Sequence, residues 1–185
     1  MTSTAEVDAD FLGTLHTRAA ERPRRLVFPE GNEPRVHAAV RTMLAEELLH
    51  PALVGSPAAI REGLRGSGTD PDAGEIGDAA SDDVVEETRA WLTERRASKR
   101  DQSSRLETWA RDPLMQAGRL VSIGAYDGAV AGCARTTGDV VRAALTCVGL
   151  QEGMQTLSSS FYMIFDADHR AGPAVLSFTD AGVVP

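Results

Sequence analysis

The first third of the chain alternates between short apolar runs and stretches with helical spacing. Residues 26–28 are apolar and lead into a proline and a glycine, which predicts a strand that ends in a turn. Residues 32–48 carry apolar side chains three and four positions apart, which predicts a helix with Asn32 as its N-cap. Residues 51–55 then predict a second strand, and residues 56–64 a short helix. Such alternation favours a parallel sheet with crossover helices.

The middle of the chain changes character. Residues 66–82 are rich in Gly, Asp and Ser and lack periodicity, which predicts a loop. Residues 83–100 have the pattern of an amphipathic helix, and residues 103–124 continue as helix. The apolar run "DGAVAG" then predicts a buried strand that Gly132 ends, with another helix beginning a few residues later.

Towards the C-terminus the pattern returns to strands. Residues 154–165 and 173–180 are strand-like and are joined by a turn, which indicates a hairpin or two adjacent strands. At the other end, residues 6–20 predict a helix. The expected organisation is an N-terminal helix within residues 1–24 and an α/β domain over residues 25–185.

Composition and charge narrow the function classes. The chain has 185 residues, 42% hydrophobic content and a formal net charge of -8, which is enough for one domain with a proper core. A general nucleic-acid binder usually has a basic surplus, so we expect no nucleic-acid partner. Because two or three local arginines can hold a small anion, the acidic total does not argue against an anionic ligand.

The number and spacing of the cysteines indicate whether the protein works in a reducing or an oxidising compartment. Cys133 and Cys147 are the only two in the sequence, and neither belongs to a CxxC pair or to a Cys/His cluster with zinc spacing. We therefore expect no metal and a reducing, cytoplasmic location. No apolar run approaches the roughly 20 residues that a membrane-spanning helix needs, and no signal peptide is recognised.

The stretch "RTTGDVVR" holds the strongest candidate chemistry. A strand that ends at Gly132, a small-residue turn and a helix start together favour an anion site, because the first N–H groups of a helix have no internal partners. Thr136 and Thr137 add hydroxyl donors, and Gly138 leaves room for a ligand. Arg142 lies four residues after Gly138 on the same helix face, where its guanidinium could hold a phosphate by two hydrogen bonds.

A simpler interpretation needs no ligand. Thr136 and Asp139 fit a capping box, and Asp139 and Arg142 are three residues apart and could pair on the helix surface. Against it, the residues around Arg142 are mostly apolar, which predicts a buried arginine. A buried charge without a partner costs several kcal/mol, so Arg142 is expected to meet an anion or to line a water-filled cleft.

Other polar clusters allow two interpretations each. The basic residues 95–100 are typical of a solvated helix end, although one arginine could reach the same cleft. Serines 158–160 are polar spacing before a strand, or hydroxyl donors in a cleft. The four histidines are scattered without a catalytic partner at motif distance, and we interpret them as surface or helix filler: His16, His37, His50 and His169.

Several segments, in this order, resemble one enzyme family. The segments are "RLVFPEGNEPRVHAAV", "PALVGSPAAI", "DPLMQAGRLVSIGAYDGAVAG", "ARTTGDVVRAALTCVGLQEGMQTLSSSFYMI" and "LSFTDAGVVP". Together they are similar to motifs of the phosphate acetyl/butyryl transferase (phosphotransacetylase) family. The resemblance implies an α/β fold: a three-layer α/β/α arrangement with a mostly parallel sheet, like the first domain and part of the second domain of phosphotransacetylases.

The resemblance also implies an activity and its residues. Family members move an acyl group between coenzyme A and phosphate, with the coenzyme A thioester as substrate and no tightly bound cofactor. The implied catalytic residues are Arg142 and one of Arg95 or Arg96, with Arg96 favoured. The implied phosphate or acyl-phosphate ligands are Thr136, Thr137, Gly138, Arg142, Ser158 and Ser159.

Departures from the family leave three hypotheses open. Family members are roughly twice as long, and Arg135 stands where the family usually has histidine. The chain is therefore interpreted as a phosphate acyltransferase-like protein that needs a complementary half or partner chain. The alternatives are a non-catalytic acyl- or phosphate-binding or regulatory module, and a small acyltransferase with a different acyl donor. A short form would leave apolar surface exposed, so we expect a homo-oligomer or a complementary half.

Overall fold

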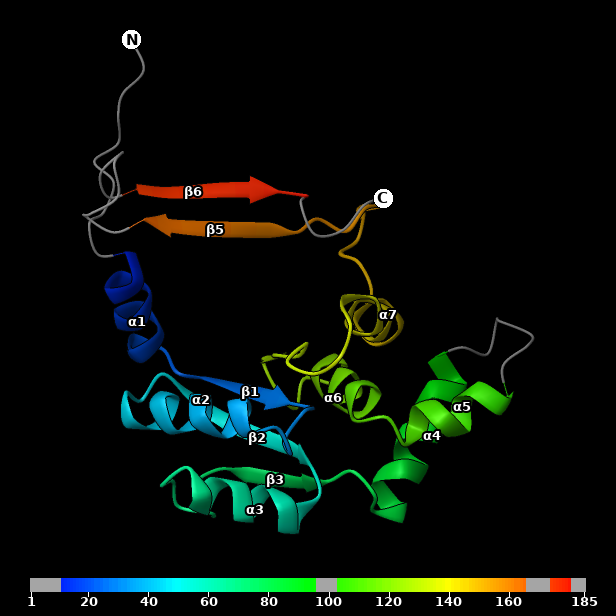
Figure 1. Ribbon diagram of the computed structural model, residues 1–185. Coiled ribbons are helices and arrows are strands. Elements are labelled where there is room, and N and C mark those ends of the chain that lie inside the picture. The colour runs from blue at the N-terminus through cyan, green and yellow to red at the C-terminus, as the bar shows by residue number, and fades with distance from the viewer. Residues whose placement is uncertain (1–10, 96–102, 166–173, 181–185) are drawn as a thin grey trace. The chain divides into compact units, whose positions relative to one another are not determined.

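The computed structural model describes residues 11–95, 103–165 and 174–180 (Figure 1). Contacts divide the chain into two compact units, and the larger one consists of residues 19–149. Residues 1–18 and 150–185 make up the smaller unit. The larger unit contains a parallel sheet and the smaller one a β-hairpin.

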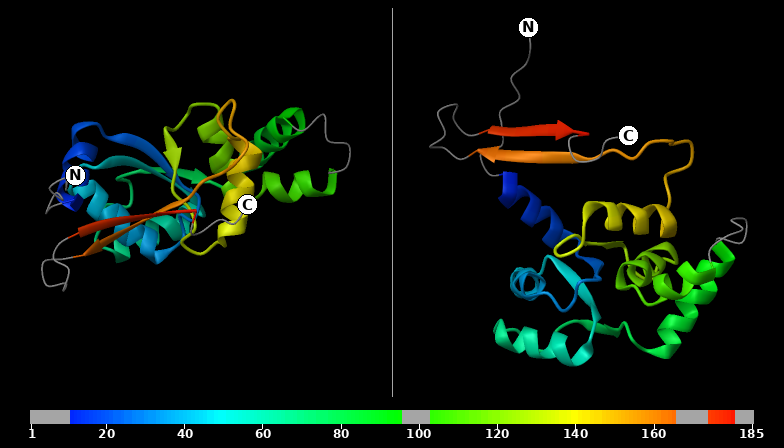
Figure 2. Two further views of the ribbon diagram at one scale, coloured as in Figure 1. Left: turned by 90° about the horizontal axis from the view of Figure 1, so that it is seen from above. Right: turned by 45° about the vertical axis from the view of Figure 1, so that its right-hand side comes forward.

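The sheet of the larger unit has its first strand in the interior. Its strands are β1 (Arg24–Phe28), β2 (Leu49–Gly55), β3 (Glu75–Asp78) and β4 (Gly128–Ala129). Their spatial order is β3-β2-β1-β4, and every neighbouring pair is parallel. Val27 of β1 pairs with Ala52 on one side and with Ala129 on the other. The carboxyl ends of all four strands therefore lie at the same edge of the sheet (Figure 2).

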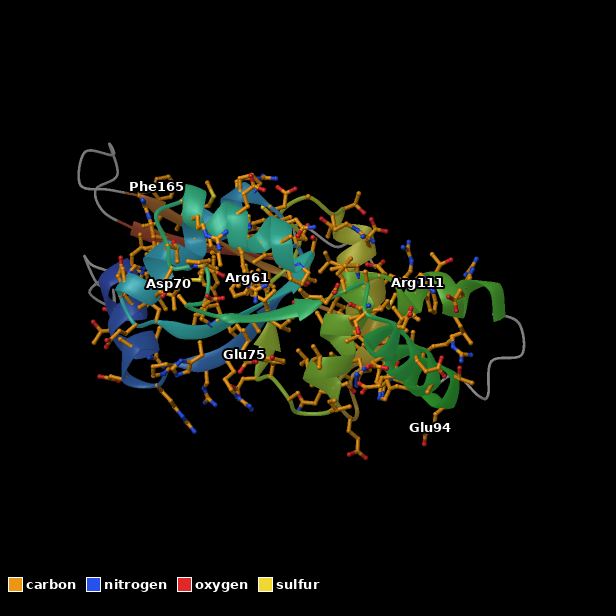
Figure 3. All side chains as sticks on the ribbon, turned by 90° about the horizontal axis from the view of Figure 1, so that it is seen from below. Arg61, Asp70, Glu75, Glu94, Arg111 and Phe165 are labelled. Carbon is orange, nitrogen blue, oxygen red and sulfur yellow. The ribbon has the colours of Figure 1, made fainter. Side chains whose placement is uncertain are left out.

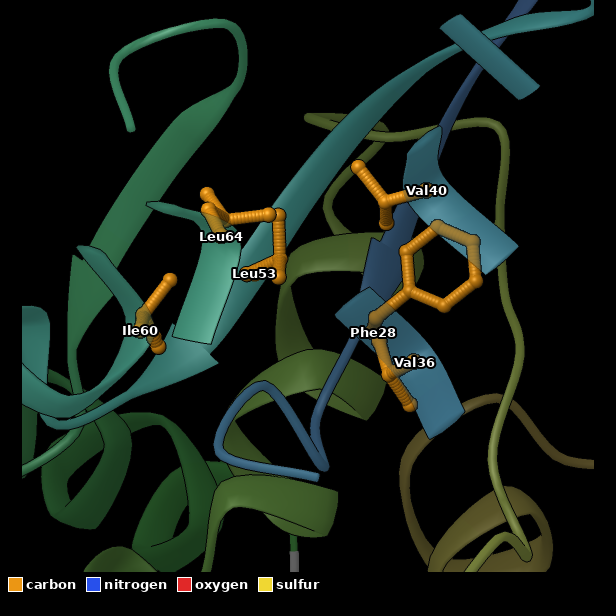
Figure 4. Packing of buried hydrophobic residues seen from close by; sticks show 6 residues of the cluster. All are labelled: Phe28, Val36, Val40, Leu53, Ile60 and Leu64. Atoms are coloured by element: carbon orange, nitrogen blue, oxygen red, sulfur yellow. The ribbon is translucent and has the colours of Figure 1, made fainter. Parts of the chain in front are cut away.

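Two helices cover one face of this sheet. They are α2 (Pro34–Ala45) and α3 (Pro57–Gly66). Phe28 and Leu53 point towards them from neighbouring strands, and the buried cluster is drawn in Figure 4. It comprises Phe28, Val36, Val40, Leu53, Ile60 and Leu64.

The opposite face is covered by α6 (Pro113–Ser122). Because side chains alternate across a strand, Val27 lies on the face opposite to Phe28, and Ala52 and Val54 on the face opposite to Leu53. These three residues form a cluster with Ala117 of α6. Helices on both faces of a parallel sheet give three layers, which confirms the α/β/α class.

A second core is made by helices alone. It involves α4 (Asp82–Arg95), α5 (Ser103–Ala110), α6 and α7 (Thr137–Cys147). Its buried members are Leu92, Leu114, Met115, Ala143 and Cys147. The other face of α4 is solvated, and Figure 3 shows Glu94 pointing away from the helix. This core fixes the position of α7, whose first turn carries most of the candidate chemistry.

Three local expectations are wrong. The predicted loop over residues 66–82 contains strand β3, which pairs with β2. The N-cap of α2 is Glu33, because the side-chain oxygen of Asn32 accepts a hydrogen bond from the N–H of Ser56 at 3.0 Å. The strand after Asp127 is not buried: β4 has two residues, Ala129 is exposed, and among the described strands β4 pairs only with β1.

The smaller unit contains the predicted hairpin. β5 (Ser160–Phe165) and β6 (Ala174–Thr179) pair in antiparallel fashion, with Phe161 opposite Phe178. α1 (Phe11–Glu21) begins in this unit, and the ring centroids of Phe11 and Tyr162 are 6.0 Å apart. Large apolar side chains on both faces of β5 are exposed, Phe161, Tyr162, Met163 and Ile164 among them.

Candidate functional site

The first turn of α7 begins with a hydrogen-bonded cap. Thr136 is the N-cap, and its hydroxyl oxygen accepts a hydrogen bond from the N–H of Asp139 at 3.2 Å. The same hydroxyl donates to the carboxylate of Asp139 at 2.8 Å. The two side chains therefore satisfy each other without a ligand, as the capping-box interpretation predicts.

Arg142 lies on the surface, so the expectation that its neighbours bury it is wrong. Its side chain is 58% exposed, and its guanidinium donates to the carboxylate of Asp139 at 2.9 Å. The apolar neighbours lie on another side of the helix, where Ala143 and Cys147 face the core. Arg142 is paired with Asp139 and exposed to solvent, so no bound anion is needed to offset burial.

Asp139 stands between two arginines. Besides Arg142, the Nε of Arg135 lies 3.9 Å from its carboxylate. The hydrogen bond from Thr136, followed by that from Arg142, holds the pKa of Asp139 below its usual value. The Asp139 carboxylate is therefore ionised at neutral pH and occupies the space between the two guanidinium groups.

Arg135 also links the starts of two helices. Its guanidinium donates to the carboxylate of Asp112 with both terminal nitrogens, at 2.8 and 3.3 Å. Asp112 is the N-cap of α6 and accepts a hydrogen bond from the N–H of Leu114 at 3.0 Å. A histidine at position 135 would lack the two parallel donors of this contact, by which Arg135 fixes the turn before α7.

The backbone before α7 forms the predicted anion-binding site, but the carboxylate of Glu30 occupies it. The carboxylate of Glu30 accepts hydrogen bonds from four successive N–H groups. Gly132 and Cys133 donate to one oxygen at 2.7 and 2.8 Å, and Ala134 and Arg135 to the other at 2.6 and 2.7 Å. Partial burial acts to raise the pKa of Glu30, but the four backbone donors together hold it below its usual value.

Two donors at the start of α7 are left over. Among the described residues, no hydrogen bond uses the backbone N–H of Thr137 or Gly138. A Cβ added at Gly138 would meet only the hydroxyl of Thr136, at 3.9 Å, so the space beside this glycine is open. Thr136, Thr137, Gly138 and Arg142 are all exposed and belong to one helix end.

The remaining predicted residues lie in the smaller unit, at the end of α4 or outside the described residues. Ser158 and Ser159 belong to the smaller unit, where the N–H of Asp180 donates to the carbonyl of Ser159 at 2.7 Å. Arg96 lies outside the described residues. Arg95, the other member of that pair, lies over the ring of Trp91 at 5.3 Å and donates to the carbonyls of Thr146 and Val148.

Sequence reasoning missed the contacts that support the site. Glu30 attracted no prediction, although it follows a strand end directly. His37 is a buried residue of α2, and its Nε2 lies 2.7 Å from the carbonyl oxygen of Gly31. The spacing of Glu30, Gly31 and His37 gives no signal that they act together, because a loop more than one hundred residues away completes the arrangement.

An apolar groove of about 380 Å³ lies beside α7. Val140, Ala143, Ala144 and Val148 line one side of it, and α6, β4 and Pro29 line the rest. Val130 and Val148 are 49% and 50% exposed.

Within the described ranges, no group of three His, Cys, Asp or Glu side chains could hold a metal ion. The same ranges contain no helix that is long and apolar enough to cross a membrane.

A three-layer parallel fold with donors and arginines at one helix start defines an α/β protein with a candidate anion site. A family model described as phosphate acetyl/butaryl transferase matches residues 10–185. The chain belongs to this family.

Individual proteins that are similar to this chain carry names from the same family. A phosphate acetyltransferase of Paracoccus denitrificans is 34% identical over 173 residues, which cover 94% of this chain and 51% of the relative. One from Clostridium acetobutylicum is 28% identical over 95% of this chain and 53% of the relative. The crystal structure of a phosphotransacetylase from Streptococcus pyogenes matches with a TM-score of 0.73 and 26% identity, covering 89% of this chain and 49% of that one. The chain thus spans about half the length of these relatives.

Proposed function

We propose that this chain is the phosphate-binding half of a phosphate acyltransferase. The reaction is acyl-CoA plus phosphate to acyl phosphate plus coenzyme A. A phosphate oxygen bonds to the thioester carbonyl carbon, the carbon–sulfur bond breaks, and the coenzyme A thiolate leaves and takes up a proton. Family membership together with the exposed, partly unoccupied donors at the start of α7 is the observation that carries the proposal.

Arg142 is the central residue of the proposed site. Its guanidinium is exposed and extends from the same helix end as the N–H groups of Thr137 and Gly138. A helix N-terminus and a guanidinium fork are two features that hold phosphate, and the hydroxyls of Thr136 and Thr137 add donors. Holding phosphate in place contributes to catalysis because it removes the entropic cost of bringing nucleophile and thioester together. We include Arg96, Ser158 and Ser159 in the proposed site on the family resemblance alone.

A complementary half is part of the proposal. Because the chain spans about half the length of its relatives, we propose that the rest of the active site lies in the half of the family's length that this sequence does not cover. Exposed apolar side chains support such a partner, both around the groove beside α7 and on the hairpin. We include a cytoplasmic location, no tightly bound cofactor, and association with a complementary acyltransferase half or with further copies of the chain.

One observation favours a second candidate, a non-catalytic phosphate- or acyl-binding module. Asp139 already pairs with Arg142, and Glu30 already fills the backbone cradle, so an incoming phosphate finds fewer free donors than the sequence predicts. In such a module phosphate would bind without turnover, with or without a partner chain.

The test follows thiol release from acetyl-CoA in the presence of phosphate. The chain is assayed alone and together with the part of the Paracoccus denitrificans relative that lies outside the matched segment. We expect turnover only with the complementing half, and we expect Arg142→Ala to reduce it at least a hundredfold. Arg89→Ala is the matched control, because Arg89 pairs with Glu86 three residues earlier on an exposed helix surface, as Arg142 pairs with Asp139.

Each result discriminates between the hypotheses. Full activity of Arg142→Ala would remove Arg142 from the site. Turnover by the chain alone would contradict the need for a second half and favour a small complete acyltransferase. Phosphate binding without turnover, even with the complementing half, would favour the binding module.

A further inference from the structure

We propose that Glu30 is a positioning residue for the phosphate donors at the start of α7. It would act through the loop of residues 132–135, without touching substrate. The inference rests on the proposed function, because it concerns the same site.

The geometry of the carboxylate is that of an anion bound in a nest of backbone donors. Both oxygens of Glu30 accept two N–H groups each, and all four distances lie between 2.6 and 2.8 Å. Four successive N–H groups that converge on one anion fix the backbone of the whole segment. Because the last donor is Arg135, the fixed segment ends next to the N-cap Thr136.

Glu30 is itself held firmly. The next residue, Gly31, donates its N–H to the carbonyl of Val54 at 3.1 Å. The carbonyl oxygen of Gly31 lies 2.7 Å from Nε2 of the buried His37. A Cβ added at Gly31 would stand 2.8 Å from the same Val54 oxygen, so the turn is pressed against β2. The carboxylate is therefore anchored to the sheet.

A second contact, from the first turn of α2, holds the same loop. The guanidinium of Arg35 donates to the carbonyl of Cys133 at 2.6 Å. The segment after β1 thus holds both kinds of backbone group in the loop, N–H groups through Glu30 and a carbonyl through Arg35. Arg135 continues the chain of contacts to Asp112, at the start of α6.

Because Glu30 occupies the N–H groups of residues 132–135, it limits which donors can bind phosphate. The N–H groups of residues 132–135 are occupied, so phosphate is left with the N–H groups of Thr137 and Gly138, the threonine hydroxyls and Arg142. Without the carboxylate, four adjacent N–H groups lose their acceptor, and the loop must rearrange or bind an anion itself. Either change moves or competes with the donors at the start of α7.

The experiment uses nuclear magnetic resonance on the full 185-residue chain, with inorganic phosphate as the probe. In the wild-type chain we expect scalar couplings across hydrogen bonds from the amide nitrogens of residues 132–135 to the Glu30 carboxyl carbon. Phosphate is then expected to shift the amide signals of Thr137 and Gly138. Glu30→Gln replaces one accepting oxygen by a donor and is expected to weaken phosphate binding at least fivefold, with changed loop amide signals.

Two variants accompany this measurement. Glu62→Gln, on the exposed side of α3, removes the same charge elsewhere and is expected to leave phosphate affinity within twofold of wild type. Glu30→Asp keeps both oxygens on a shorter side chain and is expected to bind phosphate more tightly than Glu30→Gln. That partial rescue distinguishes positioning by a carboxylate from a general loss of stability.

The outcomes separate the inference from the proposed function. Missing couplings in the wild-type chain would overturn the inference even where Glu30→Gln does not fold. Phosphate binding by Glu30→Gln with wild-type affinity would also overturn it, and would leave the proposed site intact. If phosphate shifts no signal of Thr137 or Gly138 in the wild-type chain while the couplings are present, the proposed site fails and the positioning role falls with it.

Discussion

Gly118 of α6 and Cys147 of α7 lie so close that a Cβ added to the glycine would stand 2.7 Å from the Cβ of Cys147. Cys147 is fully buried, and its thiol lies 3.7 Å from the carbonyl oxygen of Met115. The two helices can therefore approach only because position 118 has no side chain. This contact sets the distance of α7, and of the candidate site on it, from the rest of the larger unit.

Gly118→Ala is expected to destabilise the protein by about 1–3 kcal/mol, since a methyl group must be forced into a filled helix contact. Denaturant unfolding followed by circular dichroism measures the change. Gly66→Ala is the control, because a Cβ at Gly66 meets nothing within 4 Å. Equal stability of the two variants would contradict the close packing of α6 and α7.

The carboxylate of Glu30 is expected to make stability dependent on pH in the acid range. Its pKa is lower in the folded protein than its ordinary value of 4.5, so its contribution is fully present above that value and is lost as the pH falls through the lowered folded-state pKa. Glu30→Gln should be less stable than wild type by about 2 kcal/mol at pH 7, as for hydrogen bonds to a charged group. Unfolding free energies of the two proteins should converge as the pH falls through the lowered pKa of Glu30. A constant difference down to acid pH would show that the carboxylate charge is not involved.

Tyr126 is expected to ionise late. Partial burial, followed by its hydrogen bond to Glu75, raises the pKa of Tyr126 to about 12 from its ordinary 10.0. Because the pKa of Tyr126 is raised in the folded protein, the neutral phenol contributes to stability below pH 10. That contribution is lost as the pH rises towards 12. Ultraviolet titration of wild type and Tyr126→Phe isolates this phenol from Tyr162. Glu75→Gln should lower the pKa, and no change in that variant would exclude Glu75 as a cause.

Asp139→Asn is expected to strengthen phosphate binding. The carboxylate competes with phosphate for Arg142 and Arg135, so removing its charge is expected to raise phosphate affinity severalfold at this exposed site. Titration with phosphate at neutral pH measures the change. Asp83→Asn removes the same charge from the first turn of α4 and should leave affinity unaltered. Weaker binding by Asp139→Asn would mean that the capping role of Asp139 outweighs its competition.

Most of the larger unit could be predicted from sequence, because its elements have local causes. α3 begins where Ser56 and Pro57 predict it, and β1 and β2 are apolar runs of suitable length. β3 escaped prediction because it has four residues with an acidic residue at each end, and its pairing with β2 is what makes it a strand.

The candidate site was only partly predictable. The cap at Thr136 involves neighbours three residues apart, so the sequence contains the whole signal. The burial expected for Arg142 failed because apolar neighbours in sequence face another side of the helix. The role of Glu30 could not be predicted, because it depends on a contact between residues 102 to 105 positions apart.

The central place of β1 has a consequence for the order of folding. β1, β2 and β3 follow one another in the chain and can pair as soon as their short crossovers close, whereas β4 and the Glu30 contacts require closure of a loop of about one hundred residues. Long closures carry the larger entropic cost and are slow. The half of the sheet formed by β1 to β3 is therefore expected to assemble first. The segment that carries Thr136 and Arg142 would then join last, so the candidate site matures only as folding of the unit is completed.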